Sequence, residues 1–468
     1  MQTTTRKIMG KVILLLALVA AVHFAGAVAT GMYLDIDKIE RAAVWWLLFG
    51  GLIVLLVVIG WIVSHVMVRC GDRHCLVRGA VVVAAIGFLV YLRWDCAPPA
   101  KVYTWADVEQ PSRQCAESRA AQMPITKLVL TNGTPMSDAV RSMLGTSMTN
   151  SVVLSCKTDI EAAWNGSTNY RAVLATLDTF DEIACITTNI SAPILNFLEL
   201  RRMAQLHWLY AQLKTVEGDP GEGVKHLAHL YSVARKALPC SGILVEKMIW
   251  IAVAGGTLSA ASQIALETNT PPEVLRAIRK EFPPLQQRDV SLRNVMIGEL
   301  ACYNWFIGVM QANIGAPSLF LWSSEKEAVP SVAKVFTPYL LNPNAAMREA
   351  WQVMEPVIAG LSKMPMECPD VGPVLERRIE RVRVKNAMGA YVLSVFLPNC
   401  MEAARKANRL KVRSDLLAVY LGKRLGEPVE LNDLWTGKPY LVDETTGTPY
   451  SLGAEKTQTD LKMPEPWK

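Results

Sequence analysis

The sequence predicts a mainly α protein, in which N-terminal transmembrane helices precede an α-helical, hairpin-rich (repeat-like) domain with a small C-terminal β-hairpin. Three observations lead to this prediction: long uncharged runs in the first 95 residues, apolar residues at three- and four-residue steps in the rest, and turn glycines near the end. We divide the 468 residues into a membrane anchor at 1–95, a mixed linker or subdomain at 96–191, a helical domain at 192–426 and a β-hairpin tail at 427–468.

Three apolar runs in the anchor are candidates for membrane-spanning helices, at about 12–33, 43–68 and 78–94. The first two are long enough to cross a hydrocarbon core of about 30 Å at a rise of about 1.5 Å per residue. Trp45 and Trp46 fit the aromatic belt of a membrane interface. The third run has 14 uncharged residues between two arginines, so it either spans the membrane or forms a re-entrant or interfacial helix.

Basic residues in the short loops predict the orientation of the anchor. They gather before the first run and after the second, at Arg6, Lys7, Lys11, Arg69, Arg73 and Arg78. By the positive-inside rule these segments face the cytoplasm, and three spans then place the rest of the chain on the extracytoplasmic side. The first run also fits a signal peptide ending near Ala25-Gly26-Ala27, and cleavage there leaves the same orientation.

The charge and cysteine content limit the classes of partner and cofactor. The net charge of +6 comes from 48 basic and 42 acidic residues that are dispersed along the chain. A nucleic-acid-binding protein concentrates its basic charge on one face, so we expect no nucleic-acid partner. The eight cysteines after the anchor form no Cys-x-x-Cys pair, which argues against a zinc site or a thioredoxin-like motif. The nearest pairs, Cys96–Cys115 and Cys156–Cys185, leave disulfides and buried thiols equally open.

The segment 96–191 mixes signals for strands, turns and helices. Residues 125–130 are compatible with a short strand, the turn 131–135 follows, and a helix is expected to begin near Ser137.

Helical periodicity dominates after this segment. The helices expected at 195–216 and 224–238 are joined by a glycine- and proline-containing turn, so we predict an antiparallel hairpin, the unit of tetratricopeptide-like arrays. The strongly apolar stretch 243–266 contains glycine, serine and threonine, which favours a buried helix over a further span. Further helices are expected at 272–282, 290–310, 345–361, 374–397 and 400–425.

Few residues offer recognisable chemistry, and we assign none as catalytic, cofactor-binding or metal-binding and expect no cofactor. His226 and His229 lie three apart on one helix, but no carboxylate motif accompanies them. The glycine-rich segment 218–225 joins two helices, so it is a turn and not a phosphate-binding loop. Glu246 and Glu299 lie on apolar helices, where burial could shift their pKa values and mark a site.

The tail carries the motifs Asn432-Asp-Leu-Trp-Thr-Gly-Lys-Pro-Tyr440 and Tyr450-Ser-Leu-Gly453. They resemble the tail of a large set of uncharacterised membrane-anchored helical proteins of planctomycete- and verrucomicrobia-type bacteria. The hairpin 200–238 and the helix 409–425 resemble segments of the same proteins. The resemblance implies a bacterial membrane-anchored protein; with the apolar runs and the positive-inside orientation, we expect a multi-pass protein of the inner (cytoplasmic) membrane with its soluble domain on the periplasmic side.

The tail is also similar to the pseudopilin C-terminus of type II secretion, in which acidic loop residues hold calcium. Asp433 and the run 437–440 match that pattern. Leu434 replaces its proline, and Ala454 and Glu455 stand where the pattern has Asp-Gly. These departures argue against calcium, and the missing N-terminal methylation signal argues against a pilus subunit.

The function that these observations favour is a membrane-anchored extracytoplasmic helical protein that serves as a non-enzymatic interaction or scaffolding module of the cell envelope. Its expected partners are the lipid bilayer and another protein. The alternatives are a membrane-tethered hydrolase with a site in a helical cleft, and an accessory subunit of a transport or secretion complex.

Overall fold

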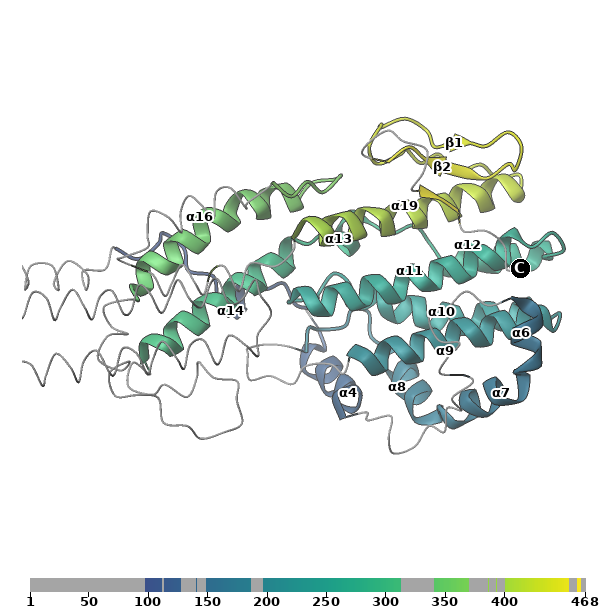
Figure 1. Ribbon diagram of the computed structural model, residues 1–468, viewed down its shortest axis with the longest axis horizontal. Coiled ribbons are helices and arrows are strands. Elements are labelled where there is room, and N and C mark those ends of the chain that lie inside the picture. The colour runs from purple at the N-terminus through teal and green to yellow at the C-terminus, as the bar shows by residue number, and fades with distance from the viewer. Residues whose placement is uncertain are drawn as a thin grey trace, which may run out of the picture. The chain divides into compact units, whose positions relative to one another are not determined.

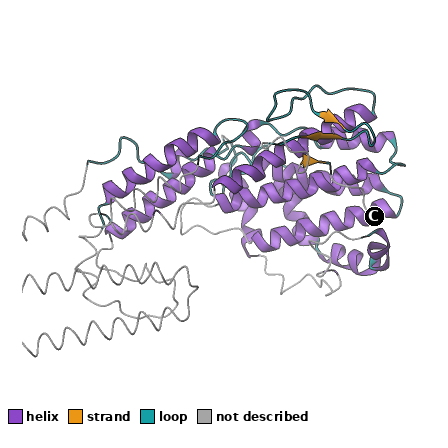
Figure 2. Cartoon of the chain, turned by 45° about the horizontal axis from the view of Figure 1, so that its top comes forward, coloured by secondary structure: helices purple, strands orange, loops and turns teal. Residues whose placement is uncertain are grey.

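The computed structural model describes residues 97–111, 113–127, 149–186, 197–312, 341–369, 400–453 and 461–463, together with Val140, Asn386 and Leu393. The chain divides into two compact units, Met1–Tyr91 and Leu92–Lys468, and every described residue belongs to the second. The three expected spans, nearly all of the helix near Ser137 and nearly all of the helix 374–397 lie outside the described residues. What is described is mainly helical, as predicted (Figures 1 and 2).

The segment after the anchor consists of short helices. They are η2 Trp105–Asp107, α4 Cys115–Lys127, α6 Asn150–Ser155, α7 Lys157–Gly166 and α8 Thr168–Asp178. A strand at 125–130 is wrong for its first three residues, because α4 continues through them. Two contacts hold α4 in place: Ser118 Oγ accepts from the Ala184 amide at 3.1 Å, and Gln122 Nε2 donates to the Ala184 carbonyl at 2.7 Å.

The predicted hairpin is formed by α9 Phe197–Val216 and α10 Pro220–Ala237. Helix α10 begins four residues earlier than the apolar pattern indicates, because Asp219 caps it by accepting from the Glu222 amide at 3.0 Å and Pro220 occupies its first turn. The two helices approach closely at Gly223, where a Cβ would lie 2.9 Å from the Ala211 carbonyl oxygen. The hairpin is therefore confirmed, and a stacked array of such hairpins stays a prediction.

Helix α11 Leu244–Leu266 packs against both α9 and α10. Among the described helices it is the one long and apolar enough to cross a membrane, and 67% of its most apolar window is buried inside the protein. Its contact with α9 is close: a Cβ at Gly256 would overlap the ring of Trp208, whose indole nitrogen donates to Thr257 Oγ1 at 3.0 Å. These contacts are those of a buried core helix, as the sequence predicted.

Further helices surround α11. They are α12 Pro272–Glu281, α13 Gln287–Val290, α14 Arg293–Ala312, α16 Pro343–Leu361 and α19 Cys400–Arg424. Helices α14 and α16 lie side by side (Figure 1). Helix α19 runs parallel to α11. Leu410 of α19 packs at Gly255 of α11, and Arg424, which is later in α19, donates to the carbonyl of Ala265, which is later in α11, at 3.2 Å.

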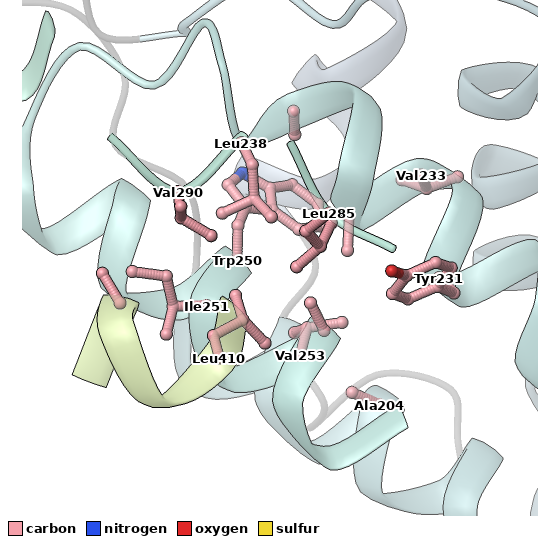
Figure 3. Close-up of a cluster of buried hydrophobic side chains, with 14 of the residues drawn as sticks. Ala204, Tyr231, Val233, Leu238, Trp250, Ile251, Val253, Leu285, Val290 and Leu410 are labelled. Carbon is pink, nitrogen blue, oxygen red and sulfur yellow. The ribbon is translucent and has the colours of Figure 1, made fainter. Parts of the chain in front are cut away.

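The core is centred on α11. Trp250 is fully buried, and Figure 3 shows Leu238, Leu285 and Val290 around its ring. Residues from α10, α11 and α19 and from the segment between α12 and α14 meet in this cluster. The core is thus assembled from elements that lie far apart in the sequence.

The tail forms a small antiparallel sheet, β1 Leu441–Val442, β2 Pro449–Ser451 and β3 Leu461–Lys462, in the order β1-β2-β3. The predicted hairpin corresponds to β1 and β2, and the third strand was not predicted. Gly437 and Gly447 occupy turn positions with φ of 65° and 70°, which glycine adopts at low cost. Tyr440 fixes the tail to α19 by donating to Asp415 Oδ2 at 3.1 Å.

Candidate functional site

The strongest concentration of buried ionisable groups lies where α10 passes into α11. Glu246 and Lys247, in the first turn of α11, are 2% and 1% exposed. We call this region the α10–α11 junction, and it consists of Cys185, the loop 238–243, Glu246, Lys247, Asn294 and Glu299.

Glu246 binds two chain segments at once. Its carboxylate accepts from Cys185 Sγ at 2.8 Å, from the Ile186 amide at 3.4 Å and from the Gly242 amide at 3.5 Å. Burial raises the pKa of this carboxyl to about 7, although the hydrogen bonds from these groups and the charge of Arg119 oppose the rise. The carboxyl therefore titrates near neutrality, as the sequence analysis foresaw for a buried glutamate.

Lys247 donates hydrogen bonds to backbone carbonyls at the end of α10 and in α13. Its ammonium donates to the Leu238 carbonyl at the end of α10 at 2.6 Å, and to the Asp289 carbonyl in α13 at 2.7 Å. Burial lowers the pKa of Lys247 to about 7, and the charges of Asp289 and Glu246 are among those that oppose this shift. The side chain thus satisfies carbonyl groups that a helix end leaves without a partner.

Helix α14 closes the junction from the other side. Glu299 accepts from the Leu244 amide at 2.7 Å, and burial raises the pKa of its carboxyl. Asn294 Nδ2 donates to the Ser241 carbonyl at 3.1 Å, while its Oδ1 accepts from the Glu109 amide at 2.6 Å. Backbone groups of the loop and of the segment before α4 are therefore bound by side chains of one helix.

The junction is packed too tightly to admit a further group. A Cβ at Gly242 would lie 2.8 Å from Cys185 Sγ, and a Cβ at Gly298 would lie 1.7 Å from the Gly242 carbonyl oxygen. A thiol beside a carboxyl of near-neutral pKa has the composition of a nucleophile and its base. Here both groups are buried and bind backbone amides or each other. The arrangement therefore joins the segment at Cys185 and Ile186 to the loop before α11.

His226 and His229, which lie three apart on α10 and were considered as possible metal ligands, are in separate environments. His226 Nε2 is 3.1 Å from Glu222 Oε1, whereas His229 Nδ1 is 2.9 Å from Asp178 Oδ2. Asp178 also accepts from Ser232 and Lys236, so its carboxylate joins α8 to α10. No group of three metal-ligating side chains occurs within the described ranges.

A second cluster, which the sequence analysis did not identify, lies between α7, α8, α9 and α10. We call it the histidine–aromatic cluster, and it consists of Trp164, Tyr170, His207, Tyr210 and His226. Trp164 stacks on Tyr210 with centroids 4.1 Å apart and planes 5° apart, and the rings of His207 and His226 meet Trp164 edge-on at 4.8 and 4.6 Å.

Burial determines the charge state of this cluster. It lowers the pKa of His207 to about 3, so the ring is neutral at physiological pH. Neither nitrogen of His207 nor the hydroxyl of Tyr170 makes a hydrogen bond in the part of the chain that the structure describes. The only signal of this cluster in the sequence is that His207 and Tyr210 lie three apart on one helix. The same spacing is equally typical of ordinary side chains on the buried face of a helix.

The remaining candidate motifs have local structural roles. The segment 218–225 forms the α9–α10 turn and the start of α10, as predicted, and Lys225 pairs with Glu222 at 3.0 Å. In the tail, Asp433 Oδ1 accepts from the Trp435 amide at 2.8 Å, and Asp443 Oδ1 accepts from the Thr445 amide at 2.9 Å. Both carboxylates therefore stabilise their own turns.

Comparison of the chain with protein-family models, with curated proteins and with solved structures gives no match.

Proposed function

We propose that the chain is a membrane-anchored helical module that binds a partner protein or supports an assembly of the cell envelope, and that its helical domain is not an enzyme. The single observation that carries this proposal is the use of the buried ionisable groups. Glu246, Lys247 and Glu299 all bind backbone groups of loops or of helix ends. Buried ionisable side chains, which in an enzyme can serve as catalytic acids or bases, here hold the backbone of the helical domain in place.

One small pocket lies among the described helices. A pocket between α11, α19 and β3, lined in part by Ser262, Arg413 and Lys462, has a volume of about 10 Å³. That volume holds one water molecule and no organic substrate.

The location in the proposal is supported by the sequence of the anchor. The runs 12–33 and 43–68 have the length and composition of spans, and the basic loops favour an extracytoplasmic helical domain. The resemblance of the tail and of the α9–α10 hairpin to membrane-anchored bacterial proteins favours the inner membrane, with the domain on its periplasmic side.

Helix α6 offers a surface for the partner. Val152 and Leu154 are 39% and 45% exposed, and they lie on either side of the buried Val153. Exposed aliphatic side chains on a short surface helix are suited to a protein contact, because their burial in an interface is favourable.

Photo-crosslinking in native membranes tests this proposal. A benzophenone amino acid at Leu154 is expected to capture a reproducible protein, which mass spectrometry identifies, whereas the same group at the exposed Glu273 of α12 is expected to capture none. Equal capture at both positions, or none at either, contradicts the proposal. Covalent trapping of Cys185 by an acylating substrate analogue would instead favour the tethered hydrolase.

A second measurement tests the sidedness separately. A cysteine introduced by Glu273→Cys is expected to react with a membrane-impermeant maleimide when the outer membrane alone is permeabilised. Reaction only after the inner membrane is opened would place the domain in the cytoplasm.

A further inference from the structure

The segment that follows the expected anchor runs beside α14, from the C-terminal half of this helix towards its start. The Tyr103 carbonyl accepts from Asn304 Nδ2 at 3.0 Å, and the Glu109 amide donates to Asn294 Oδ1 at 2.6 Å. As the chain moves away from the anchor, its partner on α14 therefore changes from residue 304 to residue 294. The C-terminal half of α14 is thus nearer to the anchor along this segment than its first turn is.

The start of α16 lies at the same end. Tyr303 of α14 donates to the Ala346 carbonyl at 3.4 Å, so the C-terminal half of α14 packs beside the first turn of α16. Arg348, in the second turn of α16, donates to the Ala97 carbonyl. Ala97 follows Trp94, at which the third apolar run is expected to end, by three residues, and three extended residues span about 10 Å. This end of the α14–α16 pair is therefore bound to a point of the chain very close to the end of that run.

The end of α14 that is nearer to the anchor carries no charge. The charged residues of this helix are Arg293 and Glu299, and residues 300–312 contain no Asp, Glu, Lys or Arg. Trp305 and Gly308 are three apart and therefore share one face of the helix. Trp305 is half-buried and is not one of the side chains that pack on the core of the described residues, and a Cβ at Gly308 would meet nothing within 4 Å. This face of α14 consequently points away from the core.

The side chains at this end are those that a membrane surface accepts. Tryptophan is enriched at the level of the lipid headgroups, because its ring is apolar and its N–H is polar, and Trp305 lies within the uncharged stretch. Arg348 lies at the same end of the helix pair, and an arginine beside an apolar surface keeps its charge among the headgroups while its stem covers apolar atoms. Whether the run 78–94 spans the membrane or lies in its interface, its end is expected at the membrane surface.

We propose that the C-terminal half of α14 lies on the phospholipid surface, through the face that carries Trp305 and Gly308, and that the helical domain thereby makes a contact with the bilayer in addition to the anchor. The inference rests on the proposed function in one respect, which is that the chain carries a membrane anchor. Phospholipid is the occupant, because a face bound this closely to the end of the anchor meets lipid at a high effective concentration.

The covalent connection explains why a small apolar face is sufficient. An isolated helix face of two or three turns binds lipid weakly, whereas a contact within an already anchored molecule requires no further loss of translational freedom. Pro98 and Pro99, which follow Ala97 directly, also limit the freedom of the connection. The contact then fixes the direction of α14 relative to the membrane plane and prevents the helical domain from turning freely about residues 95–97.

Photo-crosslinking of the purified full-length chain in vesicles of phosphatidylethanolamine and phosphatidylglycerol tests this contact. A benzophenone amino acid replaces Trp305 or, in a second variant, Gly308, so that one poorly folded variant does not decide the outcome. Arg293, exposed at the start of the same helix, is the matched control. After irradiation and digestion, we expect the peptide that contains position 305 or 308 to gain the mass of one phospholipid, and the peptide that contains position 293 to gain none.

The same benzophenone group at Trp46, within the second expected span, separates this inference from the proposed function. Lipid capture at Trp46 but at neither Trp305 nor Gly308, or equal capture at Arg293, overturns the contact of α14 and leaves the anchored helical module standing. Absence of lipid capture at all four positions overturns the anchor and with it both proposals. In native membranes, capture of a protein in place of a phospholipid at Trp305 would show that this face is a protein interface and would overturn the lipid contact.

Discussion

The α10–α11 junction and the histidine–aromatic cluster bury ionisable side chains in opposite ways. At the junction, Glu246 and Lys247 are surrounded by hydrogen-bonding groups of several loops. In the cluster, His207 is surrounded by rings, and burial keeps it neutral. Buried polar groups of the first kind fix the backbone, whereas a ring of the second kind mainly fills volume. The two regions are therefore expected to respond differently to substitution and to pH.

The largest effect is expected from Gly298→Ala at the junction. The new Cβ would lie 1.7 Å from the Gly242 carbonyl oxygen, so the loop whose Gly242 amide binds Glu246 must move. We expect a loss of about 3 kcal/mol or more in the free energy of unfolding, measured by urea denaturation of the full chain in detergent. Gly308→Ala is the matched control on the same helix, because a Cβ there meets nothing within 4 Å. That control should stabilise α14 by up to about 1 kcal/mol, and equal losses in both variants would contradict the close packing of the junction.

Lys247→Met is expected to be the next most damaging change. It leaves the Leu238 and Asp289 carbonyls without their donor, at a cost of about 2 to 4 kcal/mol. Because the folded pKa of Lys247 lies near 7, below its ordinary 10.5, its contribution to stability is present above pH 10.5 and is lost as the pH falls through 7. The destabilisation by Lys247→Met should thus grow between pH 7 and pH 10, as measured by thermal unfolding at each pH. The exposed control Lys225→Met should leave the midpoint of thermal unfolding unchanged. A loss of stability in Lys247→Met that does not depend on pH would contradict the pKa shift of Lys247.

Glu246→Gln tests the same junction through the opposite pH dependence. The folded pKa of Glu246 is raised from 4.5 to about 7, so its contribution to stability is present below pH 4.5 and is lost as the pH rises through 7. Relative to the wild type, the glutamine variant should gain stability between pH 5 and pH 8, by no more than about 1.4 kcal/mol per pH unit. Urea denaturation at four pH values measures this gain. The exposed control Glu273→Gln should not show it, and parallel curves for wild type and Glu246→Gln would exclude a titrating Glu246.

His207→Phe is expected to have the smallest effect. Phenylalanine keeps the ring packing on Trp164, and no hydrogen bond of His207 within the described residues is lost, so the change should cost less than about 1.5 kcal/mol at pH 7. The folded pKa of His207 lies near 3, below the ordinary 6.5, so the wild type loses stability as the pH falls from 6.5 towards 3. The phenylalanine variant should resist acid better, as followed by circular dichroism. A variant that is more sensitive to acid would show that His207 holds a polar partner.

Most helices could be located from the sequence because their apolar periodicity is local information. The junction could not be derived in the same way, although Glu246 and Glu299 were recognised as buried acids. The partners of Glu246 include Cys185, which is 61 positions away and whose carbonyl accepts from Arg119 of α4 at 2.7 Å. The expected strand was wrong at residues 125–127 for a similar reason, since contacts of Ser118 and Gln122 with Ala184 stabilise α4 against a local preference.

The partners of the cysteines could not be derived from the sequence either. Closeness in sequence pointed to Cys156 and Cys185 as a pair, whereas in the structure both are thiols and Cys185 Sγ donates to Glu246 at 2.8 Å. The third tail strand, Leu461–Lys462, was missed because two residues carry no detectable alternation. Short elements and distant contacts depend on tertiary packing, which one sequence does not display.

The parallel packing of α11 and α19 has a consequence for the synthesis of the protein. When the ribosome has completed α11, the helix that will cover Gly255 through Leu410 has not yet been made. During that interval a 23-residue apolar helix stands exposed in a chain whose first segments are themselves expected to enter the bilayer. We expect the glycines, serines and threonine that lower the hydropathy of α11, and docking of α11 on α9 and α10 as soon as it is made, to oppose its insertion as a further span. Thr257→Leu, which raises the hydropathy of α11 and removes the acceptor of the Trp208 indole nitrogen, is therefore expected to favour insertion as well as to weaken the packing on α9.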